Sequence, residues 1–253
     1  MFKFFRKIRQ KLLSENKFSQ YLVYAIGEII LVVIGILIAL QINNYSEQKK
    51  ERKQEIILLQ NLSKDVGLDI KQIDSNSKKT NERLGRLNTT LSFLNSKDSI
   101  GIDEFSNRSF EFMVDNYFSS NSGIFDEAVS SGKMSYIKNP LLSQAIFDYY
   151  RNAKQSLIDG TSRQITDEVI TPLLVESVML NKKAFARLGM QVENIADIEA
   201  LDIESLKSNR DFWRMSLLKF GSNQEQLMRW GFLKQDAQGL KLKIDQELER
   251  LTN

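Results

Sequence analysis

The chain contains neither cysteine nor histidine. Without cysteine it can form no disulfide bond and no thiolate nucleophile. Without histidine the usual zinc sites and every Ser-His-Asp or Cys-His catalytic arrangement are excluded. Carboxylates, lysines, tyrosines and hydroxyls remain as acids, bases or nucleophiles, and they form no recognisable catalytic motif or phosphate-binding loop. We therefore expect no enzymatic activity, no bound cofactor and no metal site.

Proline is nearly absent as well, with two residues in 253, and no segment alternates apolar and polar residues as a half-buried strand would. Apolar side chains instead recur every three or four residues, which is typical of helices. They include Leu59, Leu62, Val66, Ile70 and Ile73, and then Leu84, Leu87, Leu91 and Leu94. The sequence predicts an all-α chain in which a transmembrane helix continues into an elongated bundle of four to six helices.

Signals for helix starts lie along the chain from residue 103 onwards. Residues with capping side chains precede the predicted helices 104–118, 123–130 and 140 onwards and a helix from 172 that should end by Gly189. These caps are Asp103, Ser122, Asn139 and Thr171. A last helical region is expected from near Asn209 towards Leu251, weakened by glycines. Pro140 and Pro172 each follow a cap directly, at the first helical position where a missing N–H costs nothing. Earlier in the chain, the polar stretch 74–81 holds no proline, so one helix is expected from Tyr45 to Asn95.

One long hydrophobic run stands out against this background. From Tyr21 to Ile42 the only charged residue is Glu28. A helix of this length is ~33 Å long and matches a hydrocarbon core of about 30 Å. The residues that follow lack the small side chains of a signal-peptide cleavage site, so the run is predicted to be an uncleaved membrane anchor.

Positive charge is concentrated before this run. Residues 1–20 carry a net charge of +5, while the other 233 residues carry −2. The positive-inside rule then places the N-terminus in the cytoplasm and the rest of the chain outside. The basic residues that we expect at the anionic inner leaflet are Lys3, Arg6, Lys7, Arg9 and Lys11. The alternative is that these charges only set the topology. The larger part has no basic excess, so no nucleic-acid partner is expected.

The predicted anchor carries three residues of interest on one helical face: Glu28, Gly35 and Ala39. The Gly-x-x-x-Ala spacing lets helices approach closely, which favours self-association or docking on another membrane helix. A carboxylate inside a membrane is costly, and three interpretations of Glu28 remain open. It forms a buried polar contact in an oligomer, it is tolerated in its protonated form, or it handles protons.

Aromatic residues gather between Phe105 and Tyr150, where ten of them fall within 46 residues. Aromatic side chains dominate the packing of protein cores, so these rings are predicted to form the core of the bundle. A ligand pocket lined by the tyrosines is the alternative.

Two N-terminal stretches, Phe4–Arg9 and Tyr24–Asn44, resemble the signature of an uncharacterised Bacteroidetes family of single-pass membrane proteins with a domain of unknown function. A looser resemblance covers 130–140 and continues to Tyr149-Tyr150. One departure is Tyr45, where the family would have tryptophan. The resemblance implies a location in the cell envelope and implies no activity.

These observations divide the chain into a basic cytoplasmic or interfacial arm (1–20), a transmembrane helix (21–43) and an extracytoplasmic helical domain (44–253) that starts with a stalk helix (44–98). The predicted function is a scaffold or sensor, anchored in the bacterial inner membrane, whose periplasmic helical domain binds a partner or ligand. The expected partners are the bilayer and a second copy or another membrane protein. The alternative is a proton-coupled or accessory subunit of an envelope machine that works through Glu28.

Overall fold

The structure is a computed structural model that describes residues 18–155, 159–177 and 203–253. Within these ranges every regular element is a helix and none is a strand, which confirms the predicted all-α class. The α-helices are α2 (Phe18–Leu94), α3 (Ile102–Phe110), α4 (Gly123–Ser130), α5 (Pro140–Ala153), α6 (Gly160–Ile165), α7 (Thr171–Ser177), α9 (Ile203–Ser208) and α10 (Arg210–Thr252). A 3-10 helix, η1 (Lys133–Tyr136), and a π-helix, η3 (Thr166–Ile170), complete them. The chain divides into two compact units, residues 1–55 and 56–253.

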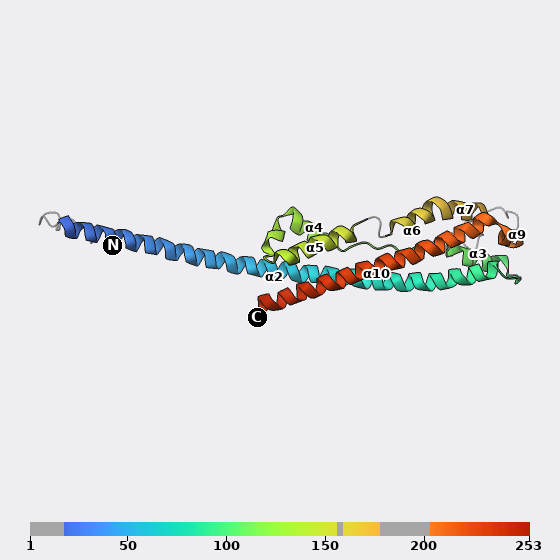
Figure 1. Cartoon of the computed structure of the whole chain (residues 1–253), viewed down its shortest axis with the longest axis horizontal. Coiled ribbons are helices and arrows are strands. Elements are labelled where there is room, and N and C mark those ends of the chain that lie inside the picture. The colour runs from blue at the N-terminus through green and yellow to red at the C-terminus, as the bar shows by residue number, and fades with distance from the viewer. Residues whose placement is uncertain (1–17, 156–158, 178–202) are drawn as a thin grey trace, which may run out of the picture. The chain divides into compact units, whose positions relative to one another are not determined.

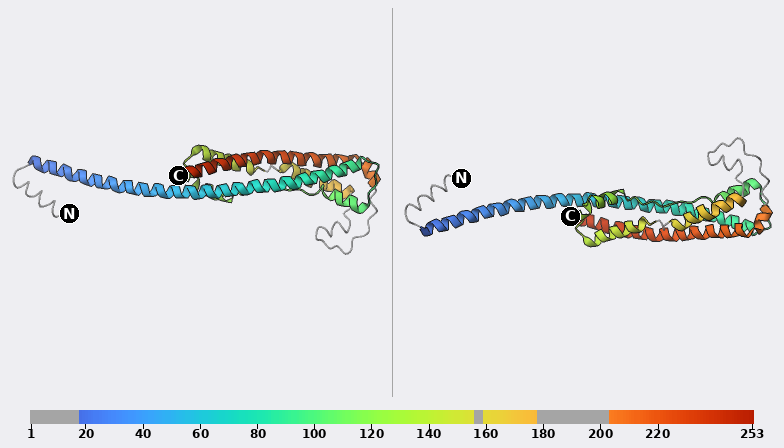
Figure 2. Two further views of the ribbon diagram at one scale, coloured as in Figure 1. Left: turned by 90° about the horizontal axis from the view of Figure 1, so that it is seen from below. Right: turned by 90° about the horizontal axis from the view of Figure 1, so that it is seen from above.

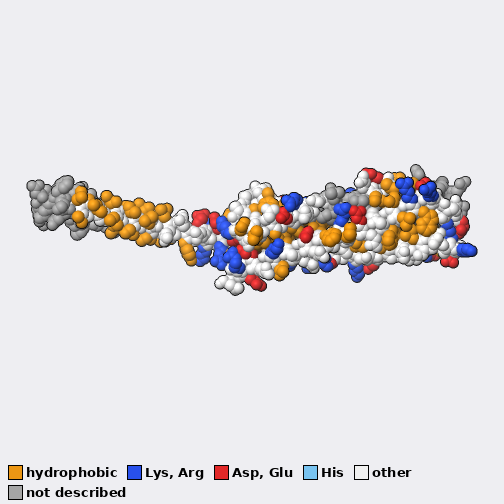
Figure 3. Space-filling view, viewed as in Figure 1, with side chains coloured by type: hydrophobic (Ala, Val, Ile, Leu, Met, Phe, Trp, Pro, Cys, Tyr) orange, Lys and Arg blue, Asp and Glu red, His pale blue; other side chains and the backbone are white. Residues whose placement is uncertain are grey.

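The first unit contains the beginning of α2. All residues from 29 to 50 are exposed, and up to residue 42 hydrophobic side chains dominate the visible surface of the helix (Figure 3). Burial of apolar surface drives folding in water, so an exposed apolar stretch of this length has no stabilising environment there. The helix is long and apolar enough to cross a membrane.

The second unit is built on the rest of α2, which continues as one helix through the polar stretch 74–81, as predicted. Here α2 runs alongside α10 in the opposite direction, as all views agree (Figures 1 and 2). A hydrogen bond and an ion pair between the two helices fix their register. Ser63 Oγ donates to Asp245 Oδ1 at a distance of 2.7 Å, and Lys234 Nζ lies 2.5 Å from Asp74 Oδ1. α10 also contacts α5, α6, η3, α7 and α9, so it is the helix on which this unit is assembled.

Two separate apolar cores flank the middle of the α2–α10 pair. One core combines α2 residues up to Ile73 with α4, α5 and the part of α10 from Trp230 onwards. The other combines the end of α2 from Leu87 with α3, α7, α9 and the start of α10 up to Met215. Apart from Leu84, the buried positions between them are polar on both helices. The polar ones are Asn76, Thr80 and Arg83 on α2 and Ser216, Lys219, Ser222, Asn223 and Gln226 on α10. We call this middle level the polar layer.

Three of the predicted helix starts are confirmed. α4 begins after Ser122, α5 begins at Pro140 and α10 begins after Asn209. Asn139 accepts hydrogen bonds from two backbone N–H groups of the first turn of α5, and Asn209 does the same for α10. These bonds satisfy donors that have no partner within the helix. The glycines of α10 do not interrupt it.

Two predicted helices were wrong in their bounds. Residues 104–118 were expected to be one helix with Asp103 as cap, but α3 starts at 102 and ends at Phe110. The residues after Phe110 are irregular because side chains of α2 bind their backbone carbonyls. Thr171 was expected to cap a new helix, but the helical run already starts at Gly160, and the π-helix η3 lies directly before it. Since Pro172 has no N–H, it removes one ordinary helical hydrogen bond, and a wider turn precedes it. The predicted end at Gly189 lies outside the described residues.

Candidate functional site

The irregular segment 111–122, between α3 and α4, lies along α2 and is held there by α2 side chains. Arg83 Nη1 donates to the carbonyl of Val114 over 2.6 Å, and Asn76 Nδ2 donates to the carbonyl of Tyr117 over 2.8 Å. A buried backbone carbonyl needs a donor, and a segment without regular structure must find it elsewhere. The polar face of α2 supplies it.

Asp69, about two turns before Asn76 on α2, holds the end of the same segment. Its Oδ1 accepts hydrogen bonds from both the backbone N–H and the side-chain Nδ2 of Asn121, each at a distance of 2.7 Å. Its Oδ2 accepts from Ser120 Oγ over 3.0 Å and from the hydroxyl of Tyr149 on α5 over 2.7 Å. Burial, together with this hydrogen bond, raises the pKa of Tyr149, so the phenol stays protonated as a donor.

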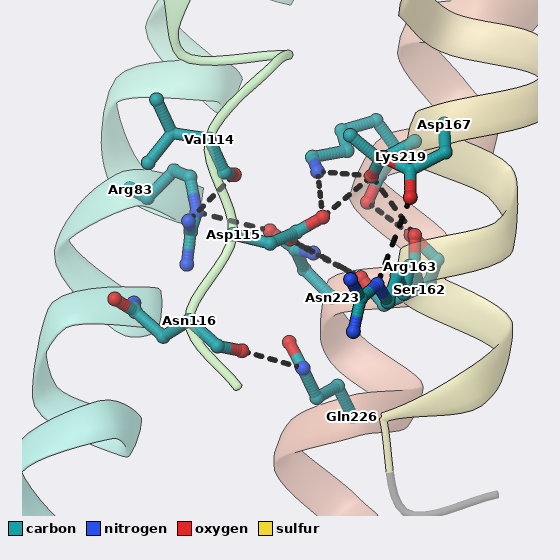
Figure 4. A network of polar contacts seen from close by, with 12 residues as sticks. Arg83, Val114, Asp115, Asn116, Ser162, Arg163, Asp167, Lys219, Asn223 and Gln226 are labelled. Carbon is teal, nitrogen blue, oxygen red and sulfur yellow. Dashed lines mark hydrogen bonds and ion pairs between the residues drawn. The ribbon is translucent and has the colours of Figure 1, made fainter. Parts of the chain in front are cut away.

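Asp115 is the centre of the polar layer (Figure 4). Its Oδ2 accepts from Lys219 Nζ over 2.7 Å and from the hydroxyl of Thr166. Its Oδ1 accepts from Asn223 Nδ2 over 3.0 Å and from Ser162 Oγ over 3.2 Å. One carboxylate therefore joins the segment 111–122 to α10, α6 and η3. The side chains of Asp115 and Lys219 are both 0% exposed.

Arg83 extends this centre to α2. Its Nε donates to Asn223 Oδ1 over 3.2 Å, and the other side of that amide contacts Asp115. Burial lowers the pKa of both Arg83 and Lys219, because a charged group loses its hydration there. The negative charge of Asp115 opposes this decrease for both residues, so the carboxylate favours the two buried cations in their charged forms.

A second carboxylate, the half-buried Asp159, lies at the end of the layer nearer the first core. Its Oδ1 accepts hydrogen bonds from Gln226 Nε2 and Trp230 Nε1, both at a distance of 2.9 Å. Its Oδ2 accepts one from the backbone N–H of Phe118 at 2.6 Å. Burial raises the pKa of Asp159, and these three donors oppose the increase. This carboxylate therefore links α10 to the segment 111–122 at Phe118, three residues after Asp115.

The polar layer is suited to holding chain segments in place and not to converting a substrate. The oxygens of Asp115 are occupied by four donors, and neither it nor Lys219 reaches the surface. A general acid or base must come within hydrogen-bond reach of its substrate, and these groups cannot. Within the described ranges no three acidic side chains come together in a way that could hold a metal ion.

A hollow of about 760 Å³ opens beside the layer, within the second unit. Tyr117, Phe118, Asp159, Arg163 and Asp167 are among its lining residues. The guanidinium of Arg163 lies 5.1 Å from the centre of the Tyr117 ring and 3.7 Å from Asp167 Oδ2. Burial and the nearby carboxylates raise the pKa of Tyr117 to about 12. The volume is in the range of sites that bind small molecules.

The alternative of a pocket lined by several tyrosines is not seen in the described lining of this hollow. Tyr117 is the one tyrosine among the described residues that line the hollow. Tyr149 and Tyr150 are packed in the first core, where the Tyr150 ring stacks on Phe125 with 4.4 Å between centroids. Phe105 and Phe112 lie in the second core, in agreement with the prediction that the aromatic residues form the core.

The residues predicted from the sequence as sites lie elsewhere. Glu28, Gly35 and Ala39 are all in the first part of α2, where Glu28 is half-buried and the other two are exposed. Apart from the neighbouring residues and backbone of α2 itself, no atom of the described residues lies within 4 Å of the position that a Cβ on Gly35 would take. The basic arm (Lys3, Arg6, Lys7, Arg9 and Lys11) lies outside the described residues.

The polar layer itself was missed, although α2 carries a signal for it. Asp69, Gln72, Asn76, Thr80 and Arg83 recur every three or four residues, at the spacing where a packed helix normally has apolar residues. A polar stripe in register with apolar stripes on either side indicates a buried polar contact.

Comparison with known proteins identifies a family but no individual relative. Neither the curated proteins nor the solved structures contain a match to this chain. Residues 28–207 match a family profile, from Glu28 through the segment 111–122 and α6 to the residues just before α10. The match covers more than half of the chain, so the protein belongs to DUF6090, a family of unknown function.

Proposed function

We propose that this protein is a membrane-anchored helical scaffold or sensor, whose second unit binds a partner or ligand outside the cytoplasm. The observation that carries the proposal is the contrast along α2. The apolar side chains at 29–42 are exposed, whereas Leu59, Leu62 and Val66 on the same helix are fully buried. Only an apolar environment stabilises the first set, and a bilayer is one that fits its length.

The polar layer supports a binding role for the second unit. Buried ion pairs add little net stability, but they specify one arrangement, because sliding one helix past the other would place a charge in an apolar core. Here a one-turn shift of α10 along α2 would move Lys219 away from Asp115. The layer thus fixes the segment 111–122, whose Tyr117 and Phe118 form part of the wall of the hollow.

A binding surface gains affinity when its residues are held in place before the partner arrives. The hollow combines aromatic rings with charges of both signs, among them Arg163 and Asp167. This composition suits a polar partner segment or a small charged molecule. The role proposed for Glu28, Gly35 and Ala39 is to bring anchors together in the membrane, which would let a binding event outside change association of the helices.

The test uses two arginines that are equally exposed, each with a 67% exposed side chain. Arg163 lines the hollow, and Arg151 on α5 does not. Full-length wild type, Arg163→Glu and Arg151→Glu are purified from native membranes after cross-linking, and the bound proteins and small molecules are identified by mass spectrometry. We expect a bound species that wild type and Arg151→Glu retain and Arg163→Glu loses. Identical sets for all three proteins would contradict the proposed binding site.

A further inference from the structure

The side of α10 that faces away from the cores carries no charge over 30 residues. At 100° per residue, ten positions lie within about 50° of one line along the helix. These positions are Leu217, Gly221, Gln224, Met228, Gly231, Phe232, Gln235, Gly239, Leu242 and Gln246, and all ten are exposed. We call this set the α10 outer stripe. In a chain with 26% charged residues, a stripe of this length without a charge is unusual for a surface that faces only water.

The stripe is also apolar where it has large side chains. Leu217, Met228, Phe232 and Leu242 are 57–60% exposed. Charged residues border the stripe on both sides: Glu225, Arg229, Asp236 and Lys243 on one, Lys234 and Lys241 on the other. An uncharged centre with a charged rim is the usual composition of a protein interface.

The outer face of α2 in the same unit shows the opposite pattern. Lys64, Lys71 and Lys78 follow one another at seven-residue spacing and are exposed. Two copies that met through this face would bring like charges together. The two long helices of the unit therefore offer one face that repels its own copy and one that does not.

We propose that the α10 outer stripe packs against the same stripe of a second, parallel copy of this chain. In a two-fold symmetric contact, residues near the axis meet their own copies, which excludes charged residues and admits apolar ones and amides. A glutamine amide both donates and accepts, so it can pair with an identical amide. Gln224, Gln235 and Gln246 recur every 11 residues, which is three helical turns, so a parallel pair repeats this contact along its length.

The glycines of the stripe fit a close contact between helices. Apart from the neighbouring residues and backbone of α10 itself, no atom of the described residues lies within 4 Å of the Cβ position at Gly221, Gly231 or Gly239, so the space above each is open to a partner. The stripe is ~44 Å long, and with a width of about 10 Å it offers on the order of 440 Å² per copy. The total of about 880 Å² is below the roughly 1,200 Å² of a standard specific interface and is typical of a weak contact. The inference therefore rests on the proposed membrane anchor, which holds copies in one orientation and raises their effective concentration.

Cysteine cross-linking in native membranes tests this contact, because the wild-type chain has no cysteine. Full-length Gln235→Cys and Met228→Cys place a thiol on the stripe. Asp236→Cys places one on the neighbouring exposed residue, about 100° around the helix, and Lys71→Cys places one on α2. A disulfide requires Cα atoms within about 7 Å. We expect a product of twice the chain mass to form roughly tenfold faster with the two stripe variants than with the two controls.

A second substitution in the Met228→Cys chain separates a specific contact from chance encounters. Adding Gln235→Lys would bring two lysines together near the axis and should slow cross-linking roughly fivefold, the factor that corresponds to about 1 kcal/mol between charges 4 Å apart in water. Adding Asp236→Lys should leave the rate unchanged. Equal rates for stripe and control cysteines, or a product of another mass, would overturn the proposal.

The same samples report separately on the anchor, since the membranes are first separated from soluble protein. A chain that sediments with membranes but does not cross-link through Gln235→Cys refutes the stripe contact and leaves the anchor standing. A soluble chain that still cross-links there supports the contact and refutes the anchor. A soluble chain without cross-linking refutes both.

Discussion

Removing the ammonium group of Lys219 while keeping the length of the side chain tests the polar layer most sharply. Lys219→Met leaves the Asp115 carboxylate buried with neutral donors only. Breaking a buried ion pair by removing one partner costs about 3–5 kcal/mol. Three donors remain on Asp115, from Ser162, Thr166 and Asn223, so we expect a loss at the lower end, about 3 kcal/mol.

The same reasoning predicts that a second substitution restores part of this loss. Asp115→Asn in the Lys219→Met chain removes the buried negative charge and keeps one oxygen for Ser162 and Asn223. The new amide N–H₂ then faces the hydroxyl of Thr166, which can accept as well as donate. We expect the double variant to be more stable than Lys219→Met but less stable than wild type, because buried Arg83 then lacks the carboxylate that favours its charged form.

Thermal unfolding of the full-length protein in detergent micelles, followed by helical circular dichroism, measures these differences. For a unit of this size 1 kcal/mol corresponds to about 2–4 °C, so Lys219→Met should lower the midpoint by ~6–12 °C. Lys133→Met removes a cation from an ion pair on the surface, where Lys133 is 45% exposed and Glu127 is 60% exposed, and should leave the midpoint unchanged. A midpoint for Lys219→Met equal to that of wild type, or a double variant no more stable than the single one, would refute the role given to the layer.

Three further predictions concern other parts of the chain. The hydrogen bond from Arg250 holds the pKa of Glu247 below its usual 4.5, so this pair contributes stability above that pH and loses it as the pH falls through the lower folded-state value. Glu247→Gln should therefore cost about 0.5–1 kcal/mol near neutral pH, and the difference from wild type should shrink in an unfolding series below pH 4.5. Asn209→Ala removes the cap of α10 and should cost about 1 kcal/mol, whereas Asn209→Asp should cost little; chemical unfolding of both variants measures this. In the anchor, Gly35→Leu should weaken self-association in a membrane two-hybrid assay, and Glu28→Gln should retain it better than Glu28→Leu if the carboxylate forms a neutral polar contact; a Gln variant that associates normally but fails in function would favour the proton-coupled alternative.

Local signals in the sequence were sufficient where local chemistry determines the structure. Asn139 with Pro140 predicted where α5 begins, because a cap acts on donors two or three residues away. The helical periodicity from near Asn209 predicted α10, and the cap that Asn209 forms was not predicted. The apolar run before residue 43 and the unbroken α2 were predicted for the same reason. In each case the residues that decide the outcome are neighbours along the chain.

The polar layer depends on residues that are far apart. Asp115 and Lys219 are 104 positions apart, and nothing near either residue distinguishes a buried charge from one on a solvated surface. The segment 111–122 was predicted as helix because its own residues permit one. Side chains of Asn76 and Arg83 on α2 bind its carbonyls instead, and this long-range competition overrides the local preference.

The location of the second unit relative to the cytoplasm tests the account most directly. A reporter enzyme that is active only outside the cytoplasm is fused after Asn253, with a fusion after Lys17 as the control, and activity is measured in intact cells. The account predicts activity for the fusion after Asn253 and none for the control, because the basic N-terminal arm stays inside and the apolar part of α2 crosses the membrane. Activity that follows the opposite pattern, or an inactive fusion at Asn253 despite a stable protein, would contradict a membrane-anchored domain outside the cytoplasm.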